Sequence, residues 1–412
     1  MTDPLPIRPG LATSRPVLIA VLAVSAVLAL VAAVLFQAPG LLGRDKVLTD
    51  YDAFYVAGLM AQRGEAAEAY SAAEMMAAQE AATGTRSFMP WTYPPPYTLF
   101  VEALAALPIG LSYLLFIGAS FAFYFAVLRR IAGEYLPGVL IAILPTIVLT
   151  VRTGQNGFLT GGLIGCFLLA FAQRHAVAGV PLGLMIIKPH LAAGIALLAL
   201  FGRRWGVVAI AAAVVIAALA AATLAFGWGI WPAFMGGVRE AGEFLTAGYY
   251  PLFRMSSIYA SLRSFHAPAP VAFALQAAGA ILALGLFVRL WLRGAEPRFL
   301  AAAACAASLF VSPYAYDYDM TILGVGIAFV LPDLLARARR AELVGLLLLT
   351  WFVTGYGIGL NSFLESDLSG VSDVVTSLGV SLTAPALILL LAAGYAVLRR
   401  PAAAVAGETV SA

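Results

Sequence analysis

The chain has 412 residues, of which 62% are hydrophobic and only 11% are charged, and its formal net charge is +3. Soluble domains carry roughly 25% charged residues, so this composition, with a mean hydropathy of +0.94, excludes a soluble domain and indicates a polytopic membrane protein. The small net charge gives no reason to expect a nucleic-acid partner. The two cysteines and three histidines lack the spacing of a disulfide or a metal site, so we expect no metal and no other cofactor.

The predicted elements begin with a polar tail at residues 1–16 and an apolar run at 17–37. This run is about one bilayer thickness of helix, and no clear cleavage site follows it, so we predict a retained first span. Residues 38–95 then form a long polar interval. Within it, Tyr55 to Ala82 alternates apolar and charged positions, which predicts short amphipathic helices on the membrane surface.

The apolar run at 97–107 predicts a juxtamembrane helix, although a thin span is the alternative. Further apolar runs follow closely, and with the first span they predict an all-α bundle of about twelve transmembrane helices. The two runs between Val177 and Phe201 are too short to cross alone at ~20 residues per span, and we expect them to form a pair that meets at Lys188 and Pro189. The runs after 97–107 are 110–128, 136–151, 157–173, 177–187, 189–201, 206–226, 271–292, 299–312, 320–336, 342–360 and 375–398.

Arginines in the short connections fall at alternate span ends, together with Arg8 and Arg15. Because cytoplasmic loops carry an excess of Lys and Arg, we predict that this face is cytoplasmic. The membrane domain is then residues 17–398, with cytoplasmic tails at 1–16 and 399–412. The long 38–95 and 227–270 loops are predicted to lie outside.

Most of the unusual polar residues at span ends fall on the predicted outer face, and they are the candidates for a functional site. A charge at mid-membrane costs about 2.5–3.5 kcal/mol on insertion scales, so Lys188, between apolar flanks, is expected to face a polar cavity or a bound anion. The alternative is a lysine that snorkels at the membrane edge. The candidates are Asp50, Asp52, Tyr93, Arg152, Gln155, Asn156, Lys188, His190, Arg254, Tyr314, Asp317 and Asp319.

Each signal also has a structural interpretation. A single acid such as Asp50 or Asp52 is commonly a solvated loop residue or a helix cap. Gln155-Asn156 is typical of a turn that closes two spans, and the tyrosines and aspartates at 314–319 are typical of an interfacial aromatic belt. Their shared position on one face is what favours a site.

Five segments that contain these candidates occur in a fixed order along the chain. They are Thr49-Asp50-Tyr51-Asp52-Ala53-Phe54-Tyr55-Val56-Ala57-Gly58, Trp91-Thr92-Tyr93-Pro94-Pro95-Pro96, Gly154-Gln155-Asn156-Gly157, Lys188-Pro189-His190, and Ser312-Pro313-Tyr314-Ala315-Tyr316-Asp317-Tyr318-Asp319. In this order the chain, from about residue 17 to 336, resembles bacterial glycosyltransferase family 87. The resemblance implies a GT-C-type enzyme of the cell membrane that takes a sugar, often mannose, from a polyprenyl-phosphate carrier.

The resemblance also implies that an acid of the first outer loop is the general base, and the matching residue is Asp50. The residues themselves agree, because good helix formers follow Ala53 and place Asp52 in the first turn of a helix, where an acid favours the helix dipole. Asp50 is then expected just before the helix, on loop backbone that faces the cavity. Some family members carry a histidine near the last segment, where this chain has Tyr314 and Tyr316.

The expected partners are a polyprenyl-phosphate-linked sugar donor, a glycan or glycolipid acceptor, and the lipid bilayer. A carboxylate can take the acceptor's proton, cations can hold the phosphate, and amide or phenol groups can bind sugar hydroxyls. A transporter or flippase for a lipid-linked sugar or small solute is the alternative. Such proteins usually show paired repeats and charges at mid-membrane depth, and we find neither in the sequence. A purely structural subunit would not explain Lys188 or the outer acids.

Overall fold

The computed structural model describes residues 10–84, 89–367 and 379–401. Within these ranges the regular elements are α-helices and short 3-10 helices, and one isolated bridge pairs Met255 with Tyr316. Several helices begin with proline in the first turn, where its missing N–H costs nothing. The expectation of an all-α protein is confirmed for the described residues.

Six apolar helical runs of the described chain are long enough to cross a membrane. They make the chain a membrane protein, as its composition predicts. The runs contain α1 (Arg15–Gln37), α5 (Ile109–Ala132) with α6 (Leu136–Ala142), α11 (Trp205–Phe226), α14 (Ala269–Leu292), α16 (Thr321–Arg337) and α17 (Arg340–Asp367).

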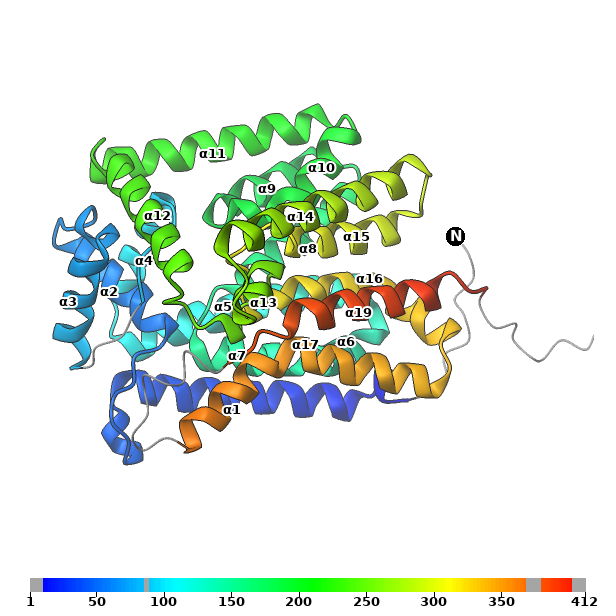
Figure 1. The fold of residues 1–412 in the computed structure, drawn as a ribbon, viewed down its shortest axis with the longest axis horizontal. Coiled ribbons are helices and arrows are strands. Elements are labelled where there is room, and N and C mark those ends of the chain that lie inside the picture. Colours follow the sequence, from blue (N-terminus) through cyan, green and yellow to red (C-terminus); the bar gives the residue numbers. More distant parts are fainter. Residues whose placement is uncertain (1–9, 85–88, 368–378, 402–412) are drawn as a thin grey trace, which may run out of the picture.

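Shorter apolar helices pack among these six (Figure 1). The predicted count of about twelve spans and the GT-C arrangement are not confirmed and stay predictions. One predicted run, 136–151, is divided, because α6 ends at Ala142 and α7 begins at Leu144, just before Pro145. The shorter helices are α7 (Leu144–Thr153), α8 (Gly157–Ala172), α9 (Gly179–Leu184), α10 (Ala193–Phe201), α15 (Pro297–Leu309) and α19 (Thr383–Leu398).

The chain breaks at Lys188, as the two short runs predict. The 3-10 helix Met185–Ile187 continues α9, and a second one, Pro189–Ala192, leads into α10. Lys188 has an extended backbone between them, with φ −145° and ψ 71°. A residue before proline is pushed out of the helical region, which explains why the break falls here.

Both predicted outer loops contain helices, and these gather at one end of the long helices (Figure 1). The backbone N–H of Ala72, at the start of α3, donates to Glu240 of α12 over 2.9 Å, so the two segments are in contact. The run at 97–107 belongs to the 11-residue α4, which at 1.5 Å per residue is about 16 Å long and too short to cross a bilayer. These helices are α2 (Asp50–Gln62), α3 (Ala72–Thr83), α4 (Pro95–Ala105), α12 (Ile230–Ala247) and α13 (Ile258–Ser264).

The start of α1 and the end of α19 lie together at the opposite end of the long helices (Figure 1). Asp333 of α16 pairs there with Arg337 and with Arg298, the latter over 3.0 Å. Arg400 pairs with Glu342 of α17 over 2.8 Å. These contacts tie the ends of four helices together and gather arginines on the face that the sequence predicts to be cytoplasmic.

Candidate active site

The first turn of α2 is closed by a capping box. One carboxylate oxygen of Asp52 accepts from the backbone N–H of Thr49 over 2.8 Å and from the Thr49 hydroxyl over 3.2 Å. The other accepts from the Lys46 ammonium over 2.6 Å. Both oxygens of this buried carboxylate are therefore engaged in starting the helix, which is the capping role expected for Asp52.

Asp50 is the first residue of α2, and not a loop residue before the helix as the sequence predicts. Thr49 is the N-cap, so the helix begins at Asp50 and includes both acids in its first turn. The Asp50 carboxylate accepts from the Gln155 side-chain amide over 3.3 Å and from the Arg254 guanidinium over 3.5 Å. Its side chain is 19% exposed.

Arg254 links Asp50 to a second carboxylate, that of Asp317, over 3.3 and 3.4 Å. It ends the 3-10 helix Leu252–Arg254, and the chain beyond it pairs with the chain before Asp317 through a bond of 2.8 Å from the Ser256 N–H to the Ala315 carbonyl. Burial would lower the pKa of Arg254, but the two carboxylates raise it above its ordinary value. The guanidinium therefore stays charged between them.

Lys188 forms the second ion pair of the site, with Asp319 over 2.8 Å. Only 8% of the Lys188 side chain and 1% of the Asp319 side chain are exposed. The ammonium also lies 4.5 Å from the centre of the Tyr318 ring and 5.8 Å from that of Tyr93, within the range of cation–π attraction. The lysine head is buried in a polar cluster and paired with Asp319, which does not favour the snorkelling interpretation.

Tyr93 and Gln155 connect the ion pairs. The Tyr93 hydroxyl donates to the side-chain carbonyl of Gln155 over 3.2 Å, and the backbone N–H of Asn156 donates to the same oxygen over 3.1 Å. Burial raises the pKa of Tyr93 although Lys188 opposes the shift, so its phenol is a neutral donor. The ring packs against Phe54 and Tyr97 at centroid distances of 5.3 and 4.7 Å, which fixes its position.

Asn156 and Tyr97 are fully buried next to this group. Among the side chains that the structure describes, neither the amide of Asn156 nor the hydroxyl of Tyr97 makes a hydrogen bond of good geometry, although the two lie close enough to interact with each other. A buried polar group without a partner costs about 1–3 kcal/mol. Such groups in native proteins call for a functional or solvent partner, so this corner of the site suits a polar guest.

The structure brings eight of the twelve candidates into this network or directly beside it, and Asp52 caps the helix next to it. The remaining three lie differently. Arg152 donates to Ser362 of α17 over 3.1 Å, and Tyr314 packs edge-on against Tyr250 at 5.9 Å, in a second core cluster. Burial raises the pKa of Tyr314 to about 12, so its phenol stays neutral. His190 is half-buried in the short helix that follows Lys188, within reach of the charges of Lys188 and Asp319, but no hydrogen bond joins it to them in the described chain.

The sequence analysis missed three residues of the cluster. Tyr316 and Tyr318 stack on each other at 5.4 Å, and Arg254 lies 5.8 Å from the Tyr316 ring centre. The alternation of tyrosine and aspartate from 316 to 319 was the available signal, because it places aromatic side chains directly next to the candidate acids Asp317 and Asp319. Lys46, which pairs with Asp52, is one of three consecutive charged residues, Arg44-Asp45-Lys46, in a polar loop, and nothing in the sequence sets it apart from its neighbours.

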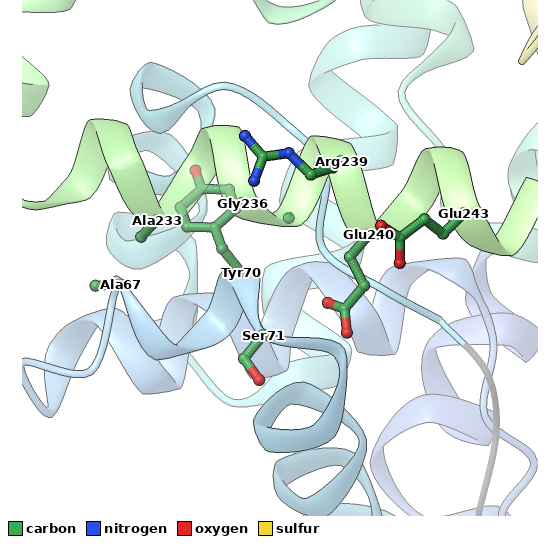
Figure 2. A pocket seen from close by; sticks show the side chains of 9 residues that line it. Ala67, Tyr70, Ser71, Ala233, Gly236, Arg239, Glu240 and Glu243 are labelled. Carbon is green, nitrogen blue, oxygen red and sulfur yellow. The ribbon is translucent and has the colours of Figure 1, made fainter.

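Two open hollows lie outside this cluster. One, of about 450 Å³, lies between α12 and the segment before α3, and Figure 2 shows Tyr70 near Gly236 on one side of it and Glu240 and Glu243 further along α12. The other, of about 470 Å³, lies between α5 and α8. Neither is lined by a candidate residue. In the described part of the chain, no group of three or more His, Cys, Asp or Glu side chains is arranged to hold a metal ion.

The described chain is thus that of an all-helical membrane protein in which buried ion pairs lie beside a partly exposed carboxylate. Residues 91–313, more than half of the chain, match the model of glycosyltransferase family 87, and the chain belongs to this family. It is therefore a membrane glycosyltransferase. The matched region includes Tyr93, Gln155, Lys188 and Arg254, whereas Asp50 lies outside it.

Comparison with curated proteins and with solved structures gives no match.

Proposed function

We propose that this glycosyltransferase moves a sugar from a polyprenyl-phosphate carrier to an acceptor hydroxyl, with Asp50 as the general base. The proposal rests on how far the side chains of the three carboxylates in the cluster are exposed. The Asp50 side chain is 19% exposed, against 2% for Asp317 and 1% for Asp319. Asp50 is therefore the carboxylate that an acceptor can reach.

The hydrogen bonds of the three acids favour the same assignment. Asp317 accepts from the backbone N–H of Tyr318 over 3.1 Å, and Asp319 accepts from that of Tyr316 over 3.0 Å, so both hold the local backbone. The described contacts of Asp50 are with side chains only, at 3.3 and 3.5 Å. Loosely held oxygens are free to accept a proton from an incoming hydroxyl.

Two cations lie beside this base, which suits a phosphate leaving group. In the proposed reaction the acceptor oxygen forms a bond to the anomeric carbon, and Asp50 takes the acceptor's proton. The bond from that carbon to the phosphate oxygen breaks, and its electron pair stays on the phosphate. Arg254 and Lys188 stabilise this charge. The described contacts of Arg254 use Nε and one terminal nitrogen, which leaves the other for a phosphate oxygen.

The proposal includes an orientation. Arg298, Arg337 and Arg400 pair near the end of α19, which lies at the other end of the long helices from α2 (Figure 1), and the positive-inside rule favours placing that end in the cytoplasm. The site then faces the outside of the bacterial cell membrane, both termini are cytoplasmic, and a glycan or glycolipid at that surface is the acceptor. Mannose is the first donor sugar to test.

The test is a transfer assay with purified protein in lipid nanodiscs, a series of polyprenyl-phosphate sugars and an acceptor glycan. We expect Asp50→Asn to lower turnover at least about 100-fold, because general bases contribute roughly 10²- to 10⁴-fold, while donor binding is retained. Asp52→Asn is the matched control, since it makes the same change two residues away in the capping box. It should cost stability and keep substantial turnover.

Three outcomes would contradict the proposal in different ways. Reversed phenotypes would move the base to Asp52, and full activity of both variants would remove this loop from the active site. Movement of the lipid-linked sugar across the membrane without any transfer product would favour the transporter alternative.

A further inference from the structure

The turn between α7 and α8, Gly154-Gln155-Asn156-Gly157, is wedged between the two acidic segments. Gly154 has a φ of +69°, and a Cβ on it would lie 2.5 Å from the Cβ of Tyr51, the neighbour of Asp50. A Cβ on Gly157 would lie 2.3 Å from the Tyr318 carbonyl oxygen, between Asp317 and Asp319. Glycine is needed at both positions for this close approach, so the turn holds Gln155 at a fixed distance from Asp50.

The side-chain amide of Gln155 has one orientation that satisfies its neighbours. Its carbonyl oxygen accepts from the Tyr93 hydroxyl and from the Asn156 backbone N–H, at 3.2 and 3.1 Å. A flipped amide would turn its NH₂ group toward the backbone donor. The NH₂ group is therefore directed at Asp50, where it donates over 3.3 Å. Only 4% of Gln155 is exposed, so this arrangement is shielded from solvent.

We propose that Gln155 is a positioning residue that orients the Asp50 carboxylate and stabilises its ionised form, and that it is not a ligand of sugar hydroxyls as the sequence suggests. This inference rests on the proposed role of Asp50. The carbonyl oxygen of Gln155 already accepts two hydrogen bonds, and its NH₂ group already donates one to Asp50. Few hydrogen-bonding positions of this amide are therefore left for a substrate. A displacement of about 1 Å in a reacting group can cost roughly 100-fold in rate. A residue that holds the base in place can therefore change the rate of transfer strongly.

The test compares Gln155→Leu with the wild type in the transfer assay over a range of pH. We expect kcat to fall about 10- to 100-fold, within the effect of a misplaced base, with unchanged donor binding. A hydrogen bond to the ionised form lowers the pKa of a carboxyl group. Its loss makes the ionised carboxylate less favourable, so the acid limb of the kcat profile should move to higher pH. Gln155→Glu, which brings a second negative charge toward Asp50, should move it further in the same direction.

A merely structural role would lower the yield and the melting temperature and leave the acid limb in place. A role in substrate binding would raise the KM for donor or acceptor at unchanged kcat. Either result would overturn the inference. Gln173→Leu is the control, because Gln173 follows the opposite end of α8 and is exposed there, and it should behave as the wild type.

The inference and the proposed function fail separately. If Asp50→Asn keeps its turnover, the proposed base is wrong whatever Gln155 does. If Asp50→Asn is inactive and Gln155→Leu keeps the wild-type kcat and acid limb, Asp50 stands as the base and the positioning role is wrong.

Discussion

Replacement of Lys188 by methionine separates its structural role from its proposed role in donor binding. The lysine is 8% exposed and its partner Asp319 is 1% exposed, at 2.8 Å. Removal of one partner leaves the other charge buried and unpaired, which typically costs 3–5 kcal/mol, so we expect about that loss in the free energy of unfolding. Methionine has a similar length, which limits the cavity that the change creates.

The double variant Lys188→Met with Asp319→Asn removes both charges. Asparagine still offers an oxygen to the Tyr316 backbone N–H, which Asp319 accepts over 3.0 Å. Replacement of a buried ion pair by neutral groups is often nearly neutral for stability. We therefore expect the double variant to recover most of the stability that the single variant loses.

In the double variant, donor binding should stay weak although the stability recovers. If Lys188 contacts the donor phosphate, both variants lack that charge-assisted hydrogen bond, which is worth roughly 1.5–3 kcal/mol, or about 10- to 100-fold in donor affinity. Melting temperature in nanodiscs and the KM for the polyprenyl-phosphate sugar measure the two effects. Recovery of both in the double variant would show that Lys188 is only structural, and an unchanged melting temperature of Lys188→Met would refute the buried pair.

Two further predictions concern topology and the tyrosine segment. In a chain whose Cys166 and Cys305 are replaced by alanine, an impermeant thiol reagent should label Glu68→Cys in intact cells and Arg293→Cys only after permeabilisation, since both positions are exposed and lie in segments predicted on opposite faces. Labelling of the second alone would reverse the orientation. Tyr314→Phe should keep its turnover, because the ring packs against Tyr250 in the second core cluster, and it should keep its pH profile, because the phenol, with a pKa of about 12, is neutral at ordinary pH. A tenfold or larger loss of turnover would contradict this.

Local features of the site could be predicted from the sequence because each depends on a few neighbouring residues. Thr49 and Asp52 have the spacing of a capping box, and the structure has that box. The short apolar runs around Lys188 and Pro189 predicted a break, since neither is long enough for a span and proline restricts the preceding residue. The gathering of arginines at one end followed from their alternation along the chain.

The ionic partners could not be predicted, because they are far apart in the sequence. Lys188 and Asp319 are 131 residues apart, and Asp50 and Arg254 are 204 apart. The packing of the helices, and the rotation of each helix about its axis, decide which charged side chains come into contact. The same reason explains Arg152, which was a candidate for the phosphate but lies on the face of α7 that contacts α17.

Tyr314 shows a related limit of the sequence pattern. It stands three residues before Asp317, and its segment turns between them, so its ring enters the second core cluster with Tyr250. Tyr316 and Tyr318, which the analysis passed over, are the tyrosines that lie against the two cations. The residue types of this segment predicted that it contributes to the cluster. Only the path of the backbone shows which of its side chains lie against the cations.

The formal charges of the cluster explain why Asp50 is suited to be the base. Asp50, Asp317 and Asp319 face two cations, Lys188 and Arg254, so one carboxylate charge has no cation of its own. Asp319 has Lys188 at 2.8 Å, and Asp317 is held by Arg254 at 3.3 and 3.4 Å, which leaves Asp50 with one shared contact at 3.5 Å. Under the proposed mechanism, the uncompensated charge disappears when Asp50 takes the proton. The leaving phosphate gains a charge in the same step, and Arg254, freed from Asp50, is the nearest cation to receive it.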